Sequence, residues 1–257
     1  MTSNQHVNPR VSIVTVSLNS AETIAETIES VLSQSYPHIE YIVIDGASTD
    51  KTMDIVHRYA DQIDKRVSEP DKGIYDAMNK GIRLASGDIV GILNADDTYD
   101  TEKVIEKVVE KMKQSGADCL WGNLVYVDRK DTRRIVRNWV SSEYKKGCFQ
   151  KGWHPPHPTF FVKKSLYDRY GLYDLSLPVA ADYELMLRFL EKYKVKSCYI
   201  PENLIKMKTG GASSKAIARI FKINMDCYRA WKINALKINP LRIILRPLSK
   251  IPQYFYD

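Results

Sequence analysis

Short apolar runs alternate with amphipathic segments along the first half of the chain. Residues 11–16, 39–44 and 89–93 are runs rich in valine and isoleucine. Runs of this length and composition are typical of strands buried on both faces of a parallel sheet. The segments between them carry apolar residues at helical spacing. Strands that alternate with helices in this way predict right-handed βαβ units and an α/β fold.

The helices can be bounded from their start and stop signals. The first is expected over residues 19–34, because Asn19 and Glu22 form a capping-box pattern at its start. Others are predicted from residue 49 or 50 onward, over 74–85 and 102–115, up to residue 171, and from about residue 180. Short strands are expected at 119–121, 124–127 and 134–140, so the second half should be a mixed sheet.

Composition narrows the class of protein. A chain of 257 residues is long enough for one large α/β domain with a small appendage. Its formal net charge of +7 favours an acidic partner, either nucleotide phosphates or an anionic membrane, and no recognition motif supports nucleic-acid binding. The four cysteines match no metal-site spacing and are expected to be reduced. With no long apolar run and a polar amino terminus, we expect a cytoplasmic protein.

Carboxylates follow two of the predicted strands. Asp45 comes after residues 39–44, and Asp96 and Asp97 come shortly after residues 89–93. In parallel sheets, ligands gather outside the carboxyl ends of the strands. Adjacent carboxylates repel each other unless a cation lies between them, and Mg²⁺ is held by one or two carboxylates together with substrate phosphates. The alternative is a polar turn in which Asp97 or Thr98 caps the helix that begins near residue 102.

Three further residues have both a functional and a structural interpretation. Lys72, in a loop with Pro70 and Gly73, is either a phosphate contact or a solvated lysine. His157 is either a metal or phosphate contact or a structural hydrogen-bonding group. Asp182, at the start of a helix, is either its N-cap or a general base exposed to a cleft. Neither a P-loop nor a G-x-G-x-x-G motif is present, which argues against Walker-type ATPases and nicotinamide enzymes.

Seven stretches together resemble the family 2 inverting glycosyltransferases, which have the GT-A nucleotide-sugar-binding fold. They are V-S-I-V-T-V-S-L-N, V-I-D-G-A-S-T-D, S-E-P-D-K-G-I-Y-D-A-M-N-K-G, G-D-I-V-G-I-L-N-A-D-D, H-P-T-F-F, G-L-Y-D and A-D-Y-E-L. The resemblance covers about residues 10–212 and is strongest to enzymes that build bacterial surface polysaccharides. It implies a mostly parallel central sheet flanked by helices. It also implies a nucleotide-diphospho-sugar donor, expected from the family to be a UDP-sugar with GDP and dTDP as alternatives, a glycan or polyprenyl-linked acceptor, and Mg²⁺ or Mn²⁺.

The resemblance also implies roles for individual positions. At the donor, Val16 and Ser17 would line the nucleotide pocket, and Asp45 would accept a hydrogen bond from the uracil ring. Asp71 and Lys72 would lie over the base or the diphosphate. Asp96 would contact the ribose or the metal, and Asp97 would hold the metal. Asp182 would deprotonate the acceptor hydroxyl. His157 is kept as a further candidate substrate contact on its own chemistry, apart from the resemblance. Two motifs depart from the family: D-D-G-S is written Asp45-Gly46-Ala47-Ser48, and D-x-D is written Asn94-Ala95-Asp96-Asp97.

These motifs divide the chain into a disordered tail (1–9), a GT-A domain (10–212) and a basic amphipathic helical extension (213–257). The domain would have a nucleotide-binding half (10–115) and an acceptor half (116–212), with residues 206–211 as a mobile basic flap over the diphosphate. A helix is predicted over 213–238. The extension would either contact an anionic membrane, on the cytoplasmic face of the inner membrane, or dock on the domain or on a dimer partner. The oligomeric state stays open.

Two other functions remain compatible with the residues. A sugar nucleotidyltransferase also binds nucleotides over a carboxylate-held metal, but it needs a glycine-rich basic loop after the first strand, where this chain has Ser17-Leu18-Asn19-Ser20. A non-catalytic carbohydrate- or membrane-binding module would need no base such as Asp182.

Overall fold

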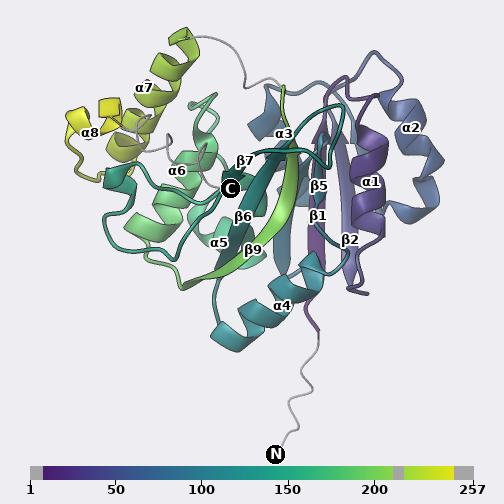
Figure 1. Cartoon of the computed structure of the whole chain (residues 1–257), viewed down its shortest axis with the longest axis horizontal. Coiled ribbons are helices and arrows are strands. Elements are labelled where there is room, and N and C mark those ends of the chain that lie inside the picture. The colour runs from purple at the N-terminus through teal and green to yellow at the C-terminus, as the bar shows by residue number, and fades with distance from the viewer. Residues whose placement is uncertain (1–7, 211–216, 246–257) are drawn as a thin grey trace, which may run out of the picture.

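The computed structural model describes residues 8–210 and 217–245 and forms a curved sheet with helices on both faces (Figure 1). The strands are β1 (Val11–Ser17), β2 (Ile39–Asp45), β3 (Lys65–Ser68), β4 (Ile89–Asn94), β5 (Asp97–Tyr99), β6 (Cys119–Val127), β7 (Ile135–Trp139), β8 (Phe161–Lys163) and β9 (Ser197–Lys208). The α-helices are α1 (Ile24–Leu32), α2 (Thr52–Arg58), α3 (Ile74–Leu84), α4 (Val104–Ser115), α5 (Lys164–Tyr170), α6 (Ala181–Leu187), α7 (Ile217–Ile233) and α8 (Pro240–Leu245).

The first half of the sheet is parallel, as the apolar runs predicted. Strands lie in the order β3-β2-β1-β4-β8-β6-β9-β5, with β7 paired to β6 outside this path. β1 lies between β2 and β4, parallel to both, with Ser17 opposite Asp45 and Val16 opposite Asn94. The polar residues that end these strands therefore meet at one edge of the sheet. The predicted fold class is confirmed.

The second half is mixed and contains two strands that the sequence pattern did not predict. β9 runs parallel to β6, and the short β5 pairs with β9 in the antiparallel direction. Residues 97–99 are thus a strand, and α4 begins only at Val104, so the predicted turn in which Asp97 or Thr98 caps that helix is wrong. β6 is one continuous strand instead of two, with its register shifted around Gly122.

The capping box at residues 19–22 is also wrong. Asn19 has a left-handed backbone (φ 48°), and its side-chain oxygen accepts a hydrogen bond from the Thr49 backbone N–H at 2.9 Å. Helix α1 begins only at Ile24. Asn19 therefore ties the loop after β1 to the loop after β2. The sequence places Ile24, Ile28, Val31 and Leu32 on the apolar side of this helix; the first three are buried and Leu32 is partly buried.

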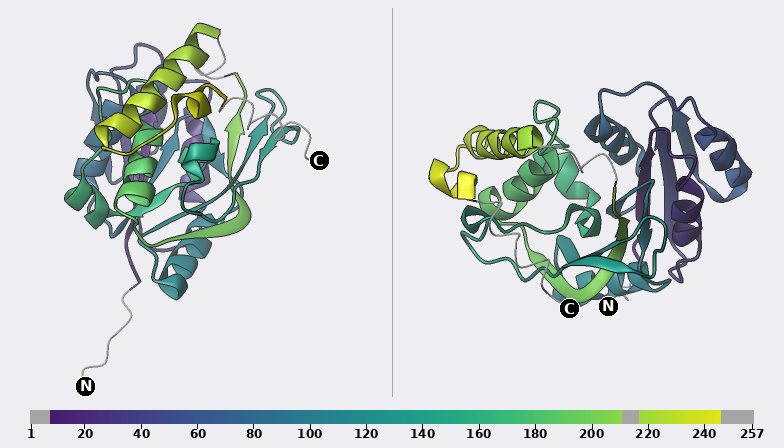
Figure 2. Two further views of the ribbon diagram at one scale, coloured as in Figure 1. Left: turned by 90° about the vertical axis from the view of Figure 1, so that its left-hand side faces the viewer. Right: turned by 45° about the horizontal axis from the view of Figure 1, so that its top comes forward.

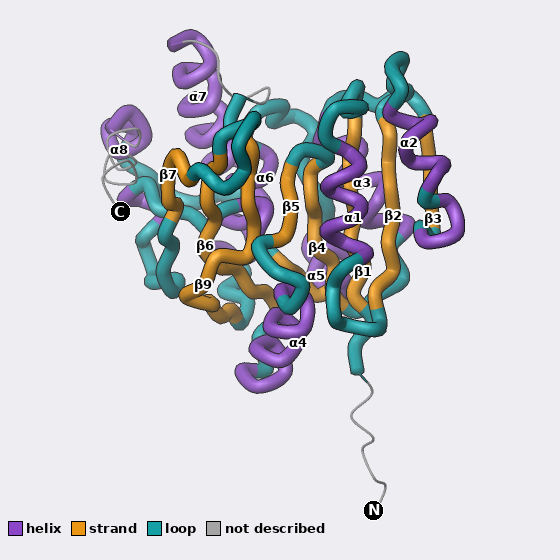
Figure 3. Tube along the Cα trace, turned by 45° about the vertical axis from the view of Figure 1, so that its right-hand side comes forward, coloured by secondary structure: helices purple, strands orange, loops and turns teal. Residues whose placement is uncertain are grey.

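Helices lie on both faces of the sheet (Figure 3). Two clusters of buried hydrophobic residues contain side chains of these helices and of the strands. One contains buried residues of α1, α2 and α4, including Ile28, Val56 and Val108. The other contains buried residues of α3, α5, α6 and α7, including Met78, Leu185 and Trp231. One sheet runs through both expected halves of the domain, so their division stays a prediction.

The segment expected to form a mobile basic flap is in large part a strand. Lys206 and Lys208 belong to β9 and pair with Asp100 (3.3 Å) and Glu26 (2.5 Å) respectively. Lys208 is buried and Lys206 is partly buried, and both belong to a strand, so neither lysine is presented on a flap. Gly210 is the last residue described before the gap at 211–216.

The described part of the carboxyl-terminal extension, residues 217–245, packs against the rest of the domain (Figure 2). α7 lies along α6, where Trp231 is buried and donates a hydrogen bond from Nε1 to the Tyr183 hydroxyl at 2.9 Å. No helix in the described ranges is long and apolar enough to cross a membrane. Residues 1–7 of the expected tail, and residues 213–216 and 246–257 of the expected extension, lie outside the described residues. The cysteines described, Cys119, Cys148, Cys198 and Cys227, form no disulfide.

Candidate active site

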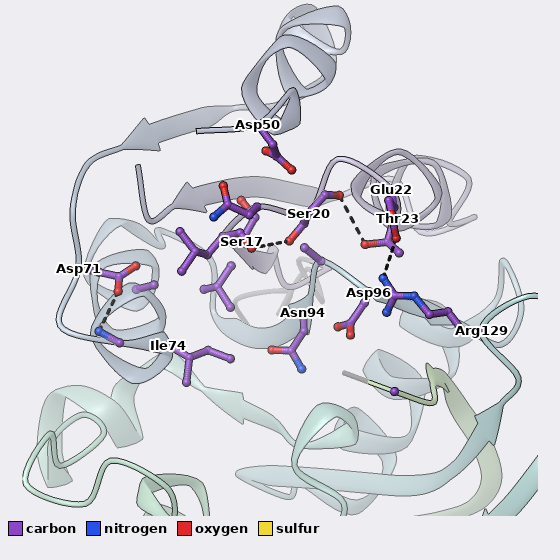
Figure 4. A pocket seen from close by; sticks show the side chains of 17 residues that line it. Ser17, Ser20, Glu22, Thr23, Asp50, Asp71, Ile74, Asn94, Asp96 and Arg129 are labelled. Atoms are coloured by element: carbon purple, nitrogen blue, oxygen red, sulfur yellow. Dashed lines mark hydrogen bonds and ion pairs between the residues drawn. The ribbon is translucent and has the colours of Figure 1, made fainter. Parts of the chain in front are cut away.

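A cavity of about 580 Å³, here called the first cavity, opens at the carboxyl ends of β1 and β4 (Figure 4). Four of the residues singled out from the sequence line it: Val16, Ser17, Asp71 and Asp96. The first two end β1, and Asp96 follows β4. The cavity therefore occupies the edge of the sheet at which ligand binding was expected.

Asp45 lies behind the wall of the first cavity. Its carboxylate is fully buried and accepts hydrogen bonds from the hydroxyls of Ser17, Ser48 and Ser68 and from the Ser48 backbone N–H, at 2.5–3.0 Å. It is not among the lining residues. In this arrangement Asp45 fixes the position of the Ser17 side chain. The contact of Asp45 with a uracil ring stays a prediction, and it requires one of the serines to break its hydrogen bond with the carboxylate.

Asp71 reaches the first cavity because a glycine lets its loop approach β2. A Cβ on Gly46 would lie 2.4 Å from Asp71 Oδ2. The other carboxylate oxygen accepts a hydrogen bond from the Gly73 backbone N–H at 2.7 Å. Lys72, by contrast, is exposed and does not line the cavity. The geometry supports a ligand contact for Asp71 more than for Lys72.

Asp96 and Asp97 are adjacent acids in different surroundings. Asp96 lines the first cavity, whereas Asp97 is fully buried at the start of β5 and accepts a hydrogen bond from Asn94 Nδ2 at 2.9 Å. Burial, reinforced by the negative charge of Asp96, raises the pKa of Asp97 well above its usual range. Burial also raises the pKa of Asp96, against the opposing effects of Arg129 and Lys208. A cation beside the pair would offset this cost of burying charge.

The side chains around Asp97 fit a divalent cation whose coordination is shared between the protein and a bound substrate. Asp97 Oδ1 and Asn94 Oδ1 are buried and have no hydrogen-bond partner among the described residues. Hard cations such as Mg²⁺ take oxygen ligands, often only one or two carboxylates plus phosphate oxygens. Within residues 8–210 and 217–245, no group of three or more His, Cys, Asp or Glu side chains could hold a metal. Oxygen atoms from a ligand would therefore have to complete the coordination.

Arg129 is a candidate residue that the sequence patterns did not indicate. It lies in the loop after β6 and is the only lysine or arginine among the described residues that line the first cavity. Its Nη2 is 3.1 Å from Oε2 of Glu22, whose side chain is 83% exposed. Figure 4 shows Arg129 on the same side of the cavity as Asp96, opposite Asp71. A solvent-exposed ion pair contributes little stability, so Arg129 can release Glu22 and bind an anionic ligand instead.

A second cavity, of about 360 Å³, adjoins the first, because Ile74 and Asn94 line both. Asp182 and His157 line this second cavity. The two predicted groups of site residues, one at the sheet edge and one before and within the later helices, are therefore neighbours in the folded chain.

Asp182 lies in the first turn of α6, but it does not cap the helix. Ala180 precedes the helix, and no side chain caps it. Instead, Oδ1 of Asp182 accepts a hydrogen bond from the Tyr75 hydroxyl at 2.9 Å. The ring of Tyr75 stacks on that of Tyr173 with 5.5 Å between centroids. Burial and the nearby charge of Asp182 raise the pKa of Tyr75, which keeps its hydroxyl protonated as a donor.

His157 belongs to the same network. Its Nε2 lies 2.8 Å from the Tyr173 hydroxyl. Burial lowers the pKa of His157, although the charge of Asp182 opposes the shift, so the ring is neutral near pH 7. The histidine lines the second cavity and not the first, where Asp96 lies. This favours the structural interpretation over a metal contact, and a contact with substrate stays a prediction.

Comparison with known sequences identifies relatives over most of the chain. The profile described as glycosyl transferase family 2 matches residues 12–171. An uncharacterized glycosyltransferase of Mycobacterium tuberculosis is 37% identical over 186 residues, which cover 70% of this chain and 68% of the relative. A putative teichuronic acid biosynthesis glycosyltransferase of Bacillus subtilis is 40% identical over 118 residues, 44% of this chain and 46% of the relative.

Solved structures show the same fold at low identity. S. aureus TarS in complex with UDP superimposes with a TM-score of 0.64 at 15% identity, over 96% of this chain and 72% of that one. The mannosyltransferase PcManGT from Pyrobaculum calidifontis, in complex with GDP-Man and Mn²⁺, gives a TM-score of 0.64 at 20% identity, over 95% and 70%. By its profile match and its fold, the chain belongs to glycosyl transferase family 2 and is a glycosyltransferase with the GT-A fold.

Proposed function

We propose that this protein transfers a sugar from a nucleotide-diphospho-sugar, with UDP as the nucleotide, to a hydroxyl of a glycan or lipid-linked acceptor, with inversion at the anomeric carbon. The observation that carries the proposal is that the two cavities adjoin at Ile74 and Asn94. The first holds groups suited to a leaving diphosphate, and the second holds the Asp182 carboxylate. Inverting transfer needs this separation, since attack and departure occur on opposite faces of the sugar.

The donor would occupy the first cavity. Val16, Ser17 and Asp71 would contact the nucleotide, and Arg129 would leave Glu22 to bind the diphosphate. Asp96, Asp97 and the side-chain oxygen of Asn94 would hold Mg²⁺ or Mn²⁺, which supplies Lewis-acid stabilisation of the departing charge. The UDP bound to TarS and the GDP-Man and Mn²⁺ bound to PcManGT support a donor and a cation of these classes.

The acceptor would enter the second cavity. Asp182 would take the proton of the attacking hydroxyl as the new glycosidic bond forms. Tyr75 would hold one oxygen of that carboxylate in a fixed orientation. No covalent nucleophile is needed, because a single displacement inverts the anomeric centre.

Cell-surface polysaccharide synthesis is the proposed setting. The teichuronic acid enzyme among the relatives supports it. A lipid-linked acceptor would favour contact with an anionic membrane, for which the exposed face of α7 carries Lys222, Arg229 and Lys232 together with Met225 and Ile233. Sedimentation with phosphatidylglycerol vesicles tests this contact: replacing Lys222 and Lys232 by glutamate should reduce the bound fraction, and equal binding would contradict it.

The proposed reaction can be tested with a panel of nucleotide sugars and Mg²⁺ or Mn²⁺. A donor should raise the melting temperature, and the cation should increase that shift. NMR of the product formed from this donor should show an inverted anomeric configuration. Retention of configuration would contradict the single-displacement mechanism, and binding that is independent of the cation would contradict the metal site.

A further inference from the structure

The second cavity has walls that are mainly apolar and aromatic. Its lining includes Leu124 and Tyr126 of β6, Trp139 of β7, Met207 of β9 and Ile223 of α7. The ring of Trp139 meets that of His154 edge-on, with 5.1 Å between centroids. The C–H bonds on one face of a pyranose ring pack well against aromatic side chains, while its hydroxyls reach polar groups at the edge. These walls suit a sugar ring.

The one carboxylate among the described residues that line the second cavity is that of Asp182, which accepts a hydrogen bond from the Tyr75 hydroxyl. Other polar side chains that line this cavity include Asn94, His154 and His157. No lysine or arginine is among the described residues that line it. The guanidinium of Arg137 lies over the rings of Tyr126 and Trp139, at 4.8 and 5.8 Å from their centroids, and is not a lining residue. The second cavity thus presents an anion and no cation from the described residues.

This distribution of charge separates two classes of acceptor. A prenyl phosphate attacks through a phosphate oxygen that is already ionised near neutral pH, so it needs a cation to hold it and no base to activate it. A carboxylate beside it would be repulsive. A sugar hydroxyl is neutral and must lose a proton during attack, so it needs a base and no cation.

We propose that the second cavity binds a neutral sugar ring at the end of the acceptor, and that a hydroxyl of this ring, not a lipid phosphate, is the nucleophile. The inference rests on the proposed function. The hydroxyl oxygen bonds to the anomeric carbon of the donor as the bond from that carbon to the diphosphate oxygen breaks. The bonding electron pair leaves with the nucleoside diphosphate, and the hydroxyl proton passes to Asp182.

The enzyme then acts after the first sugar of a chain has been attached. If the acceptor is lipid-linked, its lipid and phosphate lie beyond the sugar that fills the second cavity. The reaction that supplies this acceptor is therefore an earlier glycosyl transfer, and the reaction performed here extends an existing saccharide.

Two acceptor probes, tested with the whole 257-residue chain, distinguish the two classes of acceptor. One is a panel of uncharged p-nitrophenyl pyranosides, and the other is farnesyl phosphate. Each is supplied with Mn²⁺ and every nucleotide sugar that raises the melting temperature, and products are detected by mass spectrometry. We expect sugar to be added to a glycoside and none to farnesyl phosphate.

Substitutions at Trp139 test where the acceptor sugar lies. Trp139→Ala should raise the KM for the glycoside about tenfold and leave the KM for the donor unchanged, because it removes one stacking face. Trp139→Phe should retain most of the affinity. Val140→Ala is the matched control, since Val140 is the next residue, is 56% exposed and does not line the cavity. Equal glycoside KM values for wild type and Trp139→Ala would overturn the stacking site.

The remaining outcomes separate this inference from the proposed function. Transfer to farnesyl phosphate overturns the acceptor class. Absence of transfer to every glycoside, while a nucleotide sugar still binds, also overturns it and leaves the donor site intact. If no nucleotide sugar binds, the proposed function itself fails.

Discussion

The Tyr75 hydroxyl donates a hydrogen bond to Asp182 across 2.9 Å, although 107 positions separate the two residues in the chain. Tyr75 lies in the first turn of α3, beside the first cavity, and Asp182 lies in the first turn of α6. The bond therefore links the helix that borders the donor region to the proposed base. A carboxylate held in one orientation is better placed to accept a proton than one that rotates freely.

Tyr75→Phe tests this link. The ring can still stack on Tyr173, so only the hydrogen bond to Asp182 is lost. We expect kcat to fall about tenfold because the carboxylate is less well oriented. The KM for the donor should not change. Steady-state kinetics with the donor and acceptor varied separately measure both values, and an unchanged kcat would remove Tyr75 from a positioning role.

Arg129→Ala tests the diphosphate contact. Loss of a charge-assisted hydrogen bond of about 1.5–3 kcal/mol should weaken UDP binding by tenfold or more, whereas uridine binding should be unaffected. Arg133→Ala is a matched control, since Arg133 belongs to the same loop, is 92% exposed and does not line the first cavity. Isothermal titration measures the affinities. An equal loss of UDP affinity in both variants would indicate a general charge effect and contradict the specific contact.

Asp97→Asn tests the cation site. Its carboxylate is fully buried, with one oxygen unpartnered in the described part of the chain. Removing this buried charge should leave the metal-free protein at least as stable as the wild type. The variant should lose the extra rise in melting temperature that Mn²⁺ gives in the presence of UDP. A full Mn²⁺ effect in Asp97→Asn would place the cation elsewhere.

Glu40 is predicted to control acid stability far from the site. Burial alone would raise its pKa, but hydrogen bonds from Lys65, Ser12 and Ser86 outweigh burial and lower it to about 2, from 4.5. Because the folded pKa is the lower one, the stabilisation is complete above about pH 5 and is lost as the pH falls toward 2. At about 1.4 kcal/mol per pKa unit, this stabilisation is about 3 to 4 kcal/mol.

Glu40→Gln should therefore lower the free energy of unfolding at pH 7 by about 3 to 4 kcal/mol and flatten its dependence on pH between 5 and 2. Glu202→Gln is the control, because the ion pair of Glu202 with Lys107 is half exposed and should contribute less than about 1 kcal/mol. Urea denaturation at several pH values measures both. Equal losses in the two variants would contradict the role of Glu40.

Hydrophobic periodicity was sufficient to predict β1, β2, β4 and the helices that follow them, because these elements bury regular apolar patterns. β9 could not be predicted in this way. Pro201, Glu202 and Asn203 interrupt its apolar residues and are exposed, and the strand exists because it pairs with β6 about 80 positions earlier. β5 is only three residues long and depends in turn on β9.

The candidate site was predicted where residues follow strands or begin helices. Ser17, Asp96 and Asp182 are of this kind, and each lines one of the two cavities. Arg129 could not be found, because it lies in a loop among other charged residues and only the folded chain brings it to β1. The hydrogen bonds from three serine hydroxyls to Asp45 could not be predicted either, since Ser17, Ser48 and Ser68 come from separate segments of the chain.

The most direct test of the account is the rate of sugar transfer by Asp182→Asn at saturating donor and Mn²⁺. General-base catalysis contributes about 10²- to 10⁴-fold, so we predict that kcat falls by at least a hundredfold while the affinity for the donor stays within about twofold of wild type. Transfer at a rate near that of the wild type would show that Asp182 is not the base.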